Sequence, residues 1–467
     1  MRLSLAEGVA LRCPDAEDAR VEGPGRSLRL GPLAPGVRAV FESLADGGIH
    51  EAEVPAAAGS DTTLAWYWLD LAGDGGLLSW TVEERGNLLL TLTPASASFL
   101  RHRATFDATQ PLQLSRFAHT RMAEGRAVLD CPTVHATAAL HDRRVVSLLF
   151  DMARPTLLAR LNQFNTGIES FTLRELVRLL AETGILVPNG LDVPASEETQ
   201  TALKQWEPHD LLFHLRSRGW GHQTRAGATY RFRGELPNPP ALKPSVTQEA
   251  VELYRPDMEA LRAGGDRTFT EVLEARRSLR GRGAAPLTVR QLGELLYRAA
   301  RVREVRTTQD GDITDRPYPG AGAVYALELY PMVGECQGLA PGAYHYDPLG
   351  HRLEKLSGPT PEFHALLDEA RAPVEPFERP EVLMVVAARV PRLAWKYETL
   401  AYSLVLQDTG ALVQTLYLVS TALGLRPYAL GRSDPDFFQR VAGVDGFGEA
   451  SVGAFAVSGG DPPDSAP

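Results

Sequence analysis

A lysine beside a tyrosine, Lys396-Tyr397, is the pair in this sequence best suited to transfer a proton. Only four of the 48 basic residues are lysine, so arginine is the default cation of the chain. An ammonium can lose its proton near neutral pH, whereas a guanidinium cannot. Burial lowers the pKa of a lysine, and a nearby cation lowers that of a tyrosine. The pair is therefore a candidate general base, and the alternative is a surface helix that carries both side chains without a catalytic role.

Three guanidiniums and a hydroxyl gather earlier in the chain, at Arg276, Arg277, Ser278 and Arg280. They follow an apolar run at helical spacing (269–273) and precede a glycine-rich loop. Arginine binds phosphate through two parallel hydrogen bonds and serine adds another, so the segment is a candidate phosphate site. The alternative is a solvated helix end.

A run of small residues forms a third candidate site, at Pro319, Gly320, Ala321 and Gly322. Small residues let backbone amides approach a flat or anionic ligand. This run is not a dinucleotide-binding fingerprint, because it precedes an expected strand (325–330) instead of following a strand and opening a helix.

The sequence also predicts some of the helices, strands and domains that position these groups. Residues 287–301 form an amphipathic helix with Thr288 as its cap. Nearer the N-terminus, residues 27–94 read as strand, helix, helix and hairpin, and residues 127–187 repeat a related order. We therefore expect two tandem winged-helix-like modules, at 1–110 and 111–190. The prolines from Pro237 to Pro244 indicate an extended linker, so a connector at 191–265 precedes a last domain at 266–467.

Composition limits the classes of function. The chain has 467 residues, 44% hydrophobic and 23% charged, as in soluble globular proteins, and no apolar run long enough to span a membrane, so we expect a cytoplasmic location. The net charge is -10, and residues 1–190 hold 18 Arg, no Lys and 22 Asp plus Glu, which argues against nucleic-acid binding. The spacings of the three cysteines and of His209, His214 and His222 predict no metal site.

Taken in order, these motifs resemble the nitroreductase superfamily, and within it the SagB-type azoline dehydrogenases. The resemblance rests on Arg-Arg-Ser-Leu-Arg (276–280), the loop at 316–325, the Lys396-Tyr397 pair, and Gln-Thr-Leu-Tyr-Leu (414–418). A stretch at 206–218 is similar to one that long members of the family carry before the flavin domain. The resemblance thus extends over nearly the whole chain.

This resemblance implies an α+β fold, with a C-terminal nitroreductase-like FMN domain built on a mixed sheet flanked by helices. It implies a homodimer in which both subunits hold FMN. Arg276 and Ser278 would take the phosphate, Arg280 would reach the pyrimidine edge, and backbone amides near Leu430-Gly431 would lie by flavin N5. The implied cofactor-binding residues are Arg276, Arg277, Ser278, Arg280, Pro319, Gly320, Ala321, Gly322, Gln414, Leu430 and Gly431.

The implied reaction is oxidation of a thiazoline or oxazoline ring to its azole in a ribosomally made peptide. A hydride would pass to the flavin, a proton to Lys396 or Tyr397, and dioxygen would be the final acceptor. The sequence departs from the family at Gly320, where a serine is usual, and at Asp408, where glutamate is frequent. These departures leave open which peptide or ring is oxidised.

The implied partners are a heterocyclised precursor peptide and a cyclodehydratase. We expect the winged modules to hold the leader peptide by strand addition, which needs no positive charge, or only to pack against the catalytic domain. Two other functions stay open: an NAD(P)H-dependent nitroreductase or another flavin oxidoreductase of the same fold, and a winged-helix regulator with a ligand-sensing domain.

Overall fold

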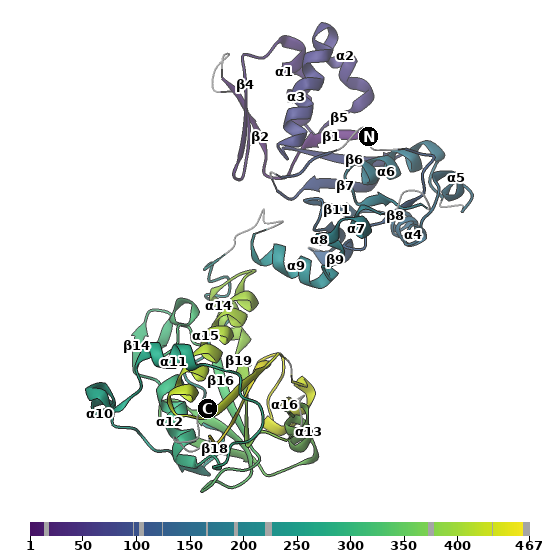
Figure 1. Ribbon diagram of the computed structural model, residues 1–467. Helices are drawn as coiled ribbons and strands as arrows, with labels where there is room; N and C mark the ends of the chain where they lie inside the picture. Colours follow the sequence, from purple (N-terminus) through teal and green to yellow (C-terminus); the bar gives the residue numbers. More distant parts are fainter. Residues whose placement is uncertain are drawn as a thin grey trace. The chain divides into compact units, whose positions relative to one another are not determined.

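The computed structural model describes residues 1–13, 18–96, 98–101, 107–123, 125–164, 167–190, 195–219, 227–371, 378–431 and 433–460. The chain divides into two compact units, Met1–Arg225 and Ala226–Pro467 (Figure 1). Each unit has its own buried apolar cores. The division lies within residues 191–265, where the sequence predicts a connector.

One seven-stranded sheet runs through the N-terminal unit in the order β5-β1-β6-β7-β11-β10-β9. Its strands and those of two small sheets are β1 (Arg2–Leu5), β2 (Ala10–Arg12), β3 (Ala19–Gly23), β4 (Arg26–Gly31), β5 (Ile49–His50), β6 (Leu78–Glu84), β7 (Asn87–Pro94), β8 (Leu112–Leu114), β9 (His119–Ala123), β10 (Arg126–Cys131), β11 (Ala136–Leu140) and β12 (Leu186–Pro188). Strands from both expected modules pair directly, with Leu92 of β7 opposite Ala138 of β11. The two expected modules therefore share one sheet, and their winged-helix form stays a prediction.

The helices of this unit follow the apolar periodicity of the sequence. They are α1 (Pro35–Ala45), α2 (Val54–Ala58), α3 (Thr62–Asp74), α4 (Arg143–Asp151), α5 (Leu158–Leu161), α6 (Ser170–Glu182), α7 (Ser196–Thr199), α8 (Thr201–Lys204) and α9 (Pro208–Ser217). Helix α1 begins at Pro35 and buries Val37, Val40, Phe41 and Leu44, as the pattern predicts. The hairpin of β6 and β7 is confirmed too.

The C-terminal unit is built on a second seven-stranded sheet, in the order β13-β18-β17-β16-β19-β21-β20. Its strands and those of a separate hairpin are β13 (Ala250–Glu252), β14 (Glu304–Thr308), β15 (Gly311–Asp315), β16 (Leu327–Val333), β17 (Gly342–Asp347), β18 (Arg352–Ser357), β19 (Val382–Ala388), β20 (Arg426–Leu430) and β21 (Ala450–Ser458). All seven residues of β16 and all seven of β19 are buried, as expected of strands at the centre of a covered sheet.

Every pairing of this sheet in the described residues is antiparallel, so the expected mixed sheet is wrong. Two helices separate β19 from β20 along the chain, an order typical of parallel neighbours. The last strand, β21, instead lies between them and runs antiparallel to both. The antiparallel pairing of β19 and of β20 thus depends on β21, the last of the described strands.

Helices occur throughout the C-terminal unit. They are α10 (Met258–Ala260), α11 (Phe269–Ala275), α12 (Val289–Ala300), α13 (Pro361–Glu369), α14 (Val390–Lys396), α15 (Ala401–Ala422) and α16 (Pro435–Ala442). Thr288 caps α12 and accepts a hydrogen bond from the Gln291 backbone N–H, which confirms the predicted start of that helix. The long helix α15 packs against α12, α14 and β20.

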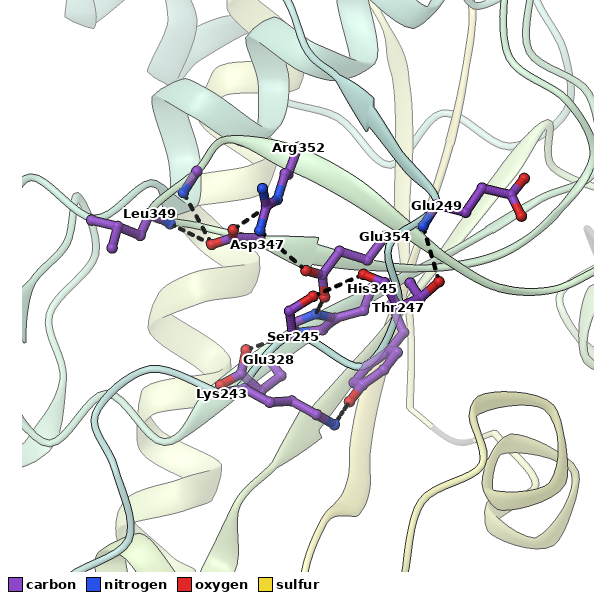
Figure 2. A network of polar contacts seen from close by, with 12 residues as sticks. Lys243, Ser245, Thr247, Glu249, Glu328, His345, Asp347, Leu349, Arg352 and Glu354 are labelled. Carbon is purple, nitrogen blue, oxygen red and sulfur yellow. Dashed lines mark hydrogen bonds and ion pairs between the residues drawn. The ribbon is translucent and has the colours of Figure 1, made fainter.

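A buried polar network fixes the segment before β13 to the sheet (Figure 2). Lys243 donates to Tyr330 and pairs with Glu449 at 2.6 Å. His345 lies between Glu328 and Glu354, with both nitrogens 3.1 Å from a carboxylate oxygen. Burial lowers the pKa of His345, but the two carboxylates outweigh burial and raise the pKa above its ordinary value. The proline-rich connector is therefore anchored to the C-terminal unit where it enters the sheet.

Three absences apply to the described residues alone. Among them, no cluster of His, Cys, Asp and Glu side chains has the arrangement of a metal site. No helix in the described ranges is long and apolar enough to cross a membrane. Cys13, Cys131 and Cys336 are free thiols, two of them buried. His222 lies outside the described residues.

Candidate active site

Lys396 is the last residue of α14 and extends its amine toward the small-residue loop. Its Nζ donates to the Gly322 carbonyl at 3.1 Å, and it lies 5.3 Å from the centre of the Tyr397 ring. Both side chains are half-buried. The structure therefore brings together the predicted base pair and the predicted loop, two segments more than seventy positions apart in the chain.

Gly322 cannot be replaced without moving this pair. Its φ of +56° lies in the left-handed region that favours glycine. A Cβ built on Gly322 would overlap the Tyr397 hydroxyl and the Lys396 amine. The absence of a side chain at 322 is what lets the loop backbone approach both candidate proton acceptors.

The departure from the family at Gly320 has a local reason. A Cβ at this position would lie 2.8 Å from the ring of Tyr325, closer than a side chain tolerates. Tyr325 is itself buried and packs edge-on against Tyr318 at 5.4 Å. The bulky ring of Tyr325 thus occupies the space that a serine at 320 would need.

Asp408 holds the loop from α15. Its two carboxylate oxygens accept the Ala321 N–H at 3.0 and 3.1 Å, and only 7% of the residue is exposed. Burial raises the pKa of Asp408 to about 6, against a smaller lowering by the Ala321 N–H. Asp408 therefore positions the loop against which Lys396 rests.

Unusual backbone conformations concentrate around this cluster. Seven described residues other than glycine have positive φ, and four of them are Tyr230, Ala323, Tyr325 and Thr399. Positive φ is rare for bulky or β-branched residues and costs about 1 to 3 kcal/mol each where the surroundings enforce it. Such strain tends to collect at functional sites, so its location supports this cluster as the active site.

The arginine segment is organised by a tyrosine of α15. The Ser278 hydroxyl lies 2.8 Å from the Tyr417 hydroxyl, which also accepts the Ala429 N–H at 2.7 Å. The Arg276 guanidinium stacks over the same ring at 5.4 Å. Tyr417 thus joins the predicted phosphate segment to β20, the strand that leads to Leu430.

Arg280, Leu430 and Gly431 line one cleft of about 340 Å³, so the structure brings together three predicted cofactor residues. Arg277 hydrogen-bonds the backbone carbonyls of Glu274 and Arg276. In the described parts of the chain, none of Arg276, Arg277 and Arg280 has a carboxylate partner, whereas Arg282 pairs with Glu335 and Arg298 with Asp266. Unpaired guanidiniums beside a hydroxyl and an open cleft fit a phosphate-bearing cofactor such as FMN.

Helix α15 carries residues of both clusters. Asp408 and Tyr417 are nine positions apart, which is about 14 Å along a helix axis at ~1.5 Å per residue. Gln414 is exposed on the same helix, and Pro319 is exposed at the edge of the loop. The structure therefore places the two clusters along one rigid element without direct contact between them among the described side chains.

From the sequence, no site role was assigned to three residues that the geometry singles out. Tyr417 lies three positions after Gln414, so helical spacing puts it on nearly the same face. Asp408 is the one charged residue of α15, a signal of a buried functional group. Tyr230, whose ring centre lies 5.9 Å from the Lys396 amine, gave no signal because the two residues are far apart in the chain.

Comparisons with known proteins agree with the motifs. The family model "Cyanobactin oxidase ThcOx" matches residues 112–223, in the N-terminal unit. A protein of Methanocaldococcus jannaschii named as a nitroreductase is 27% identical over 186 residues, which cover 39% of this chain and 85% of that protein.

Two peptide-processing proteins are similar as well. The trifolitoxin-processing protein TfxB of Rhizobium leguminosarum bv. trifolii is 27% identical over 35% of this chain and 44% of its own length. The microcin B17-processing protein McbC of Escherichia coli is 26% identical over 30% of this chain and 50% of its own length. The matches thus span about half of each of these two relatives. Together with the motifs, they confirm the resemblance of this chain to the SagB-type dehydrogenases of the nitroreductase superfamily.

Proposed function

We propose that this protein oxidises azoline rings to azoles in a heterocyclised precursor peptide, with FMN as its redox cofactor. The observation that carries the proposal is the Lys396 amine, held against the Gly322 carbonyl beside Tyr397 in a strained, half-buried cluster. The names of TfxB and McbC, which process peptides, support a peptide substrate.

In the proposed reaction, one ring carbon loses a hydride and its neighbour loses a proton. FMN, when bound, supplies the hydride acceptor. Lys396 or Tyr397 takes the proton. Asp408 keeps the loop in place through Ala321, so the base pair does not have to reorganise during turnover.

FMN would be held by the second cluster. Arg276 and Ser278 would bind its phosphate, and Arg280, which lines the cleft with Leu430 and Gly431, would contact its ring system. In this proposal two copies of the chain associate and each lends the loop at 319–322 to the other's cofactor. The N-terminal unit binds the leader peptide along the edge strand β9, whose one sheet partner among the described residues is β10.

The test is mass spectrometry of a thiazoline-containing peptide incubated with the FMN-loaded protein in air. The proposal predicts a product lighter by two hydrogens, both lost from the ring. A peptide of unchanged mass after exposure to cofactor-loaded protein would argue against the function.

A second candidate is an NAD(P)H-driven nitroreductase, because the M. jannaschii relative bears that name and is covered over most of its length. Anaerobic mixing of the flavin-loaded protein with NADPH separates the two. Rapid loss of the yellow colour would favour the nitroreductase, and a slow response would favour the peptide dehydrogenase.

A further inference from the structure

Residues 227–240, which we name the strap, lie against the end of α14 in the C-terminal unit. Gly227 and Glu398 form an isolated antiparallel bridge, and the Thr229 hydroxyl donates to the Glu398 carboxylate at 2.9 Å. The Tyr230 N–H donates to the Lys396 carbonyl at 3.2 Å. The strap is therefore attached to the backbone of the candidate base itself.

Two side chains of α14 fix the rest of the strap. The Trp395 indole N–H donates to the Leu236 carbonyl at 2.8 Å. Arg392 is 3% exposed, and its guanidinium donates to carbonyls of Pro239 and Val324. The buried Arg392 guanidinium holds the Pro239 and Val324 segments in place, because breaking these hydrogen bonds would leave a buried charge without partners.

The strap is also joined to the hairpin of β14 and β15. Arg233 forms an ion pair with Asp310 at 2.7 Å, and the Asn238 side chain donates to the Asp310 carbonyl. Between strap, hairpin and α14 lies a cleft of about 210 Å³. Its walls include Tyr230, Asn238, Gln309, Gly322, Trp395 and Lys396.

Tyr230 forms the aromatic wall of this cleft. Its ring centre is 5.9 Å from the Lys396 amine and 5.8 Å from the Trp395 ring, which it meets edge-on. Its φ is +52°, a conformation that a bulky residue rarely adopts. The hydrogen bonds from the Tyr230 N–H to the Lys396 carbonyl and from Thr229 to Glu398 hold this part of the strap, with the Tyr230 ring near the candidate base.

We propose that this strap cleft binds the ring-bearing segment of the peptide substrate, with Tyr230 packing against the flat heterocycle next to Lys396. A volume of 210 Å³ equals about seven water molecules at ~30 Å³ each, room for one five-membered ring and an adjoining amide. Aromatic walls suit a flat uncharged ring, and the amides of Asn238 and Gln309 suit a peptide backbone. The inference deepens the proposed function, on which it rests.

The probe is a short peptide with a central thiazole, which binds as a product and cannot be oxidised. FMN-loaded full-length protein is treated with the amine reagent trinitrobenzenesulfonate, and labelling of each lysine is quantified by peptide mass spectrometry. Lysine is scarce in this chain, so every site can be followed, and Lys355 on β18 serves as the internal reference.

We expect the thiazole peptide to protect Lys396 from labelling and to leave Lys355 unaffected. Tyr230→Ala should raise the peptide concentration for half-protection about tenfold, because an aromatic contact is lost. Tyr230→Phe keeps the ring and should match the parent, as should Glu235→Ala, a strap variant outside the cleft. Thermal unfolding of each variant reports whether the strap is still folded.

Equal labelling of Lys396 with and without the peptide would overturn the inference. So would a Tyr230→Ala variant in which the peptide half-protects Lys396 at the same concentration as in the parent protein. Oxidation of a thiazoline peptide is measured separately on the parent protein. Protection without oxidation would contradict the proposed function and support the cleft, whereas oxidation without protection would contradict the cleft alone.

Discussion

The two clusters of the candidate site differ in how completely one chain builds them. Around Lys396, a backbone carbonyl, a buried carboxylate and an attached strap fix the reactive groups from several sides. Around Ser278, by contrast, the guanidiniums of Arg277 and Arg280 are exposed, and Tyr417 is the main support.

This difference indicates separate tasks. Proton transfer needs reacting groups held within a fraction of an ångström, and preorganisation by the protein supplies that. Anion binding needs unpaired cations that remain available until the ligand arrives. We therefore expect substitutions at the Lys396 cluster to reduce turnover, and those at the arginine cluster to reduce cofactor affinity.

The largest effect is expected for the double variant Lys396→Ala, Tyr397→Phe. Loss of general base catalysis should lower kcat by roughly 10² to 10⁴ while FMN affinity stays at the parent value. Peptide oxidation kinetics and a flavin titration check both parts. Lys355→Ala, which removes a surface lysine paired with Glu249, is the matched control. Parent-like turnover in the double variant would remove the assignment of the base.

The variant Gly322→Ala tests whether the loop positions Lys396 and Tyr397. The added Cβ meets the Tyr397 hydroxyl and the Lys396 amine, and both side chains must move. Because small misplacements of reacting groups are costly, kcat should fall by up to about 10², with little change in FMN affinity. Gly410→Ala on α15, where a Cβ meets nothing within 4 Å, is the control. A Gly322→Ala variant as fast as Gly410→Ala would show that the loop does not set the position of the base.

The arginine cluster should respond in the opposite way. Arg276→Ala with Ser278→Ala removes two hydrogen-bonding groups to the phosphate, and FMN affinity should fall about 10- to 100-fold. Equilibrium dialysis with FMN measures this change. Arg282→Ala, whose guanidinium pairs with Glu335, should bind FMN normally. If saturating FMN fails to restore turnover in the double variant, the two clusters are not separable in function.

A smaller effect is expected on the pH dependence of stability, through Asp408, which supports the loop. The pKa of Asp408 in the folded protein is about 6, above its ordinary 3.8, so ionisation is harder in the folded state. The variant Asp408→Asn does not titrate at this position but still accepts the Ala321 N–H. Compared with this variant, the parent protein therefore loses free energy of unfolding as the pH rises from about 4 to about 6. Above pH 7 the variant should be more stable by about 1 to 3 kcal/mol, and near pH 4 the two should agree. Denaturant unfolding at both pH values is the measurement, and a gap independent of pH would contradict the assignment.

Local patterns in the sequence predict much of what the structure contains. The capping Thr288 and the apolar spacing of α12 are confirmed, because such signals act within one turn of chain. The contact between Lys396 and Gly322 could not be predicted from their spacing in the sequence, although the order of the motifs indicated that both belong to one site. It depends on α14 ending beside a loop that precedes β16.

Features that depend on distant segments could not be predicted. The antiparallel sheet follows from the insertion of β21 between β19 and β20. The strap looks like a linker in the sequence because prolines indicate extension, and its attachment arises from the buried Arg392 and from Trp395. The raised pKa of Asp408 follows from burial of its side chain, which tertiary packing decides.

The most direct test of the account is anaerobic mixing of FMN-loaded protein with a thiazoline peptide while flavin absorbance is recorded. We expect loss of the oxidised flavin band within the time of one turnover, together with the azole product, and neither change in the Lys396→Ala, Tyr397→Phe variant. Flavin that stays oxidised in the presence of bound peptide would contradict it.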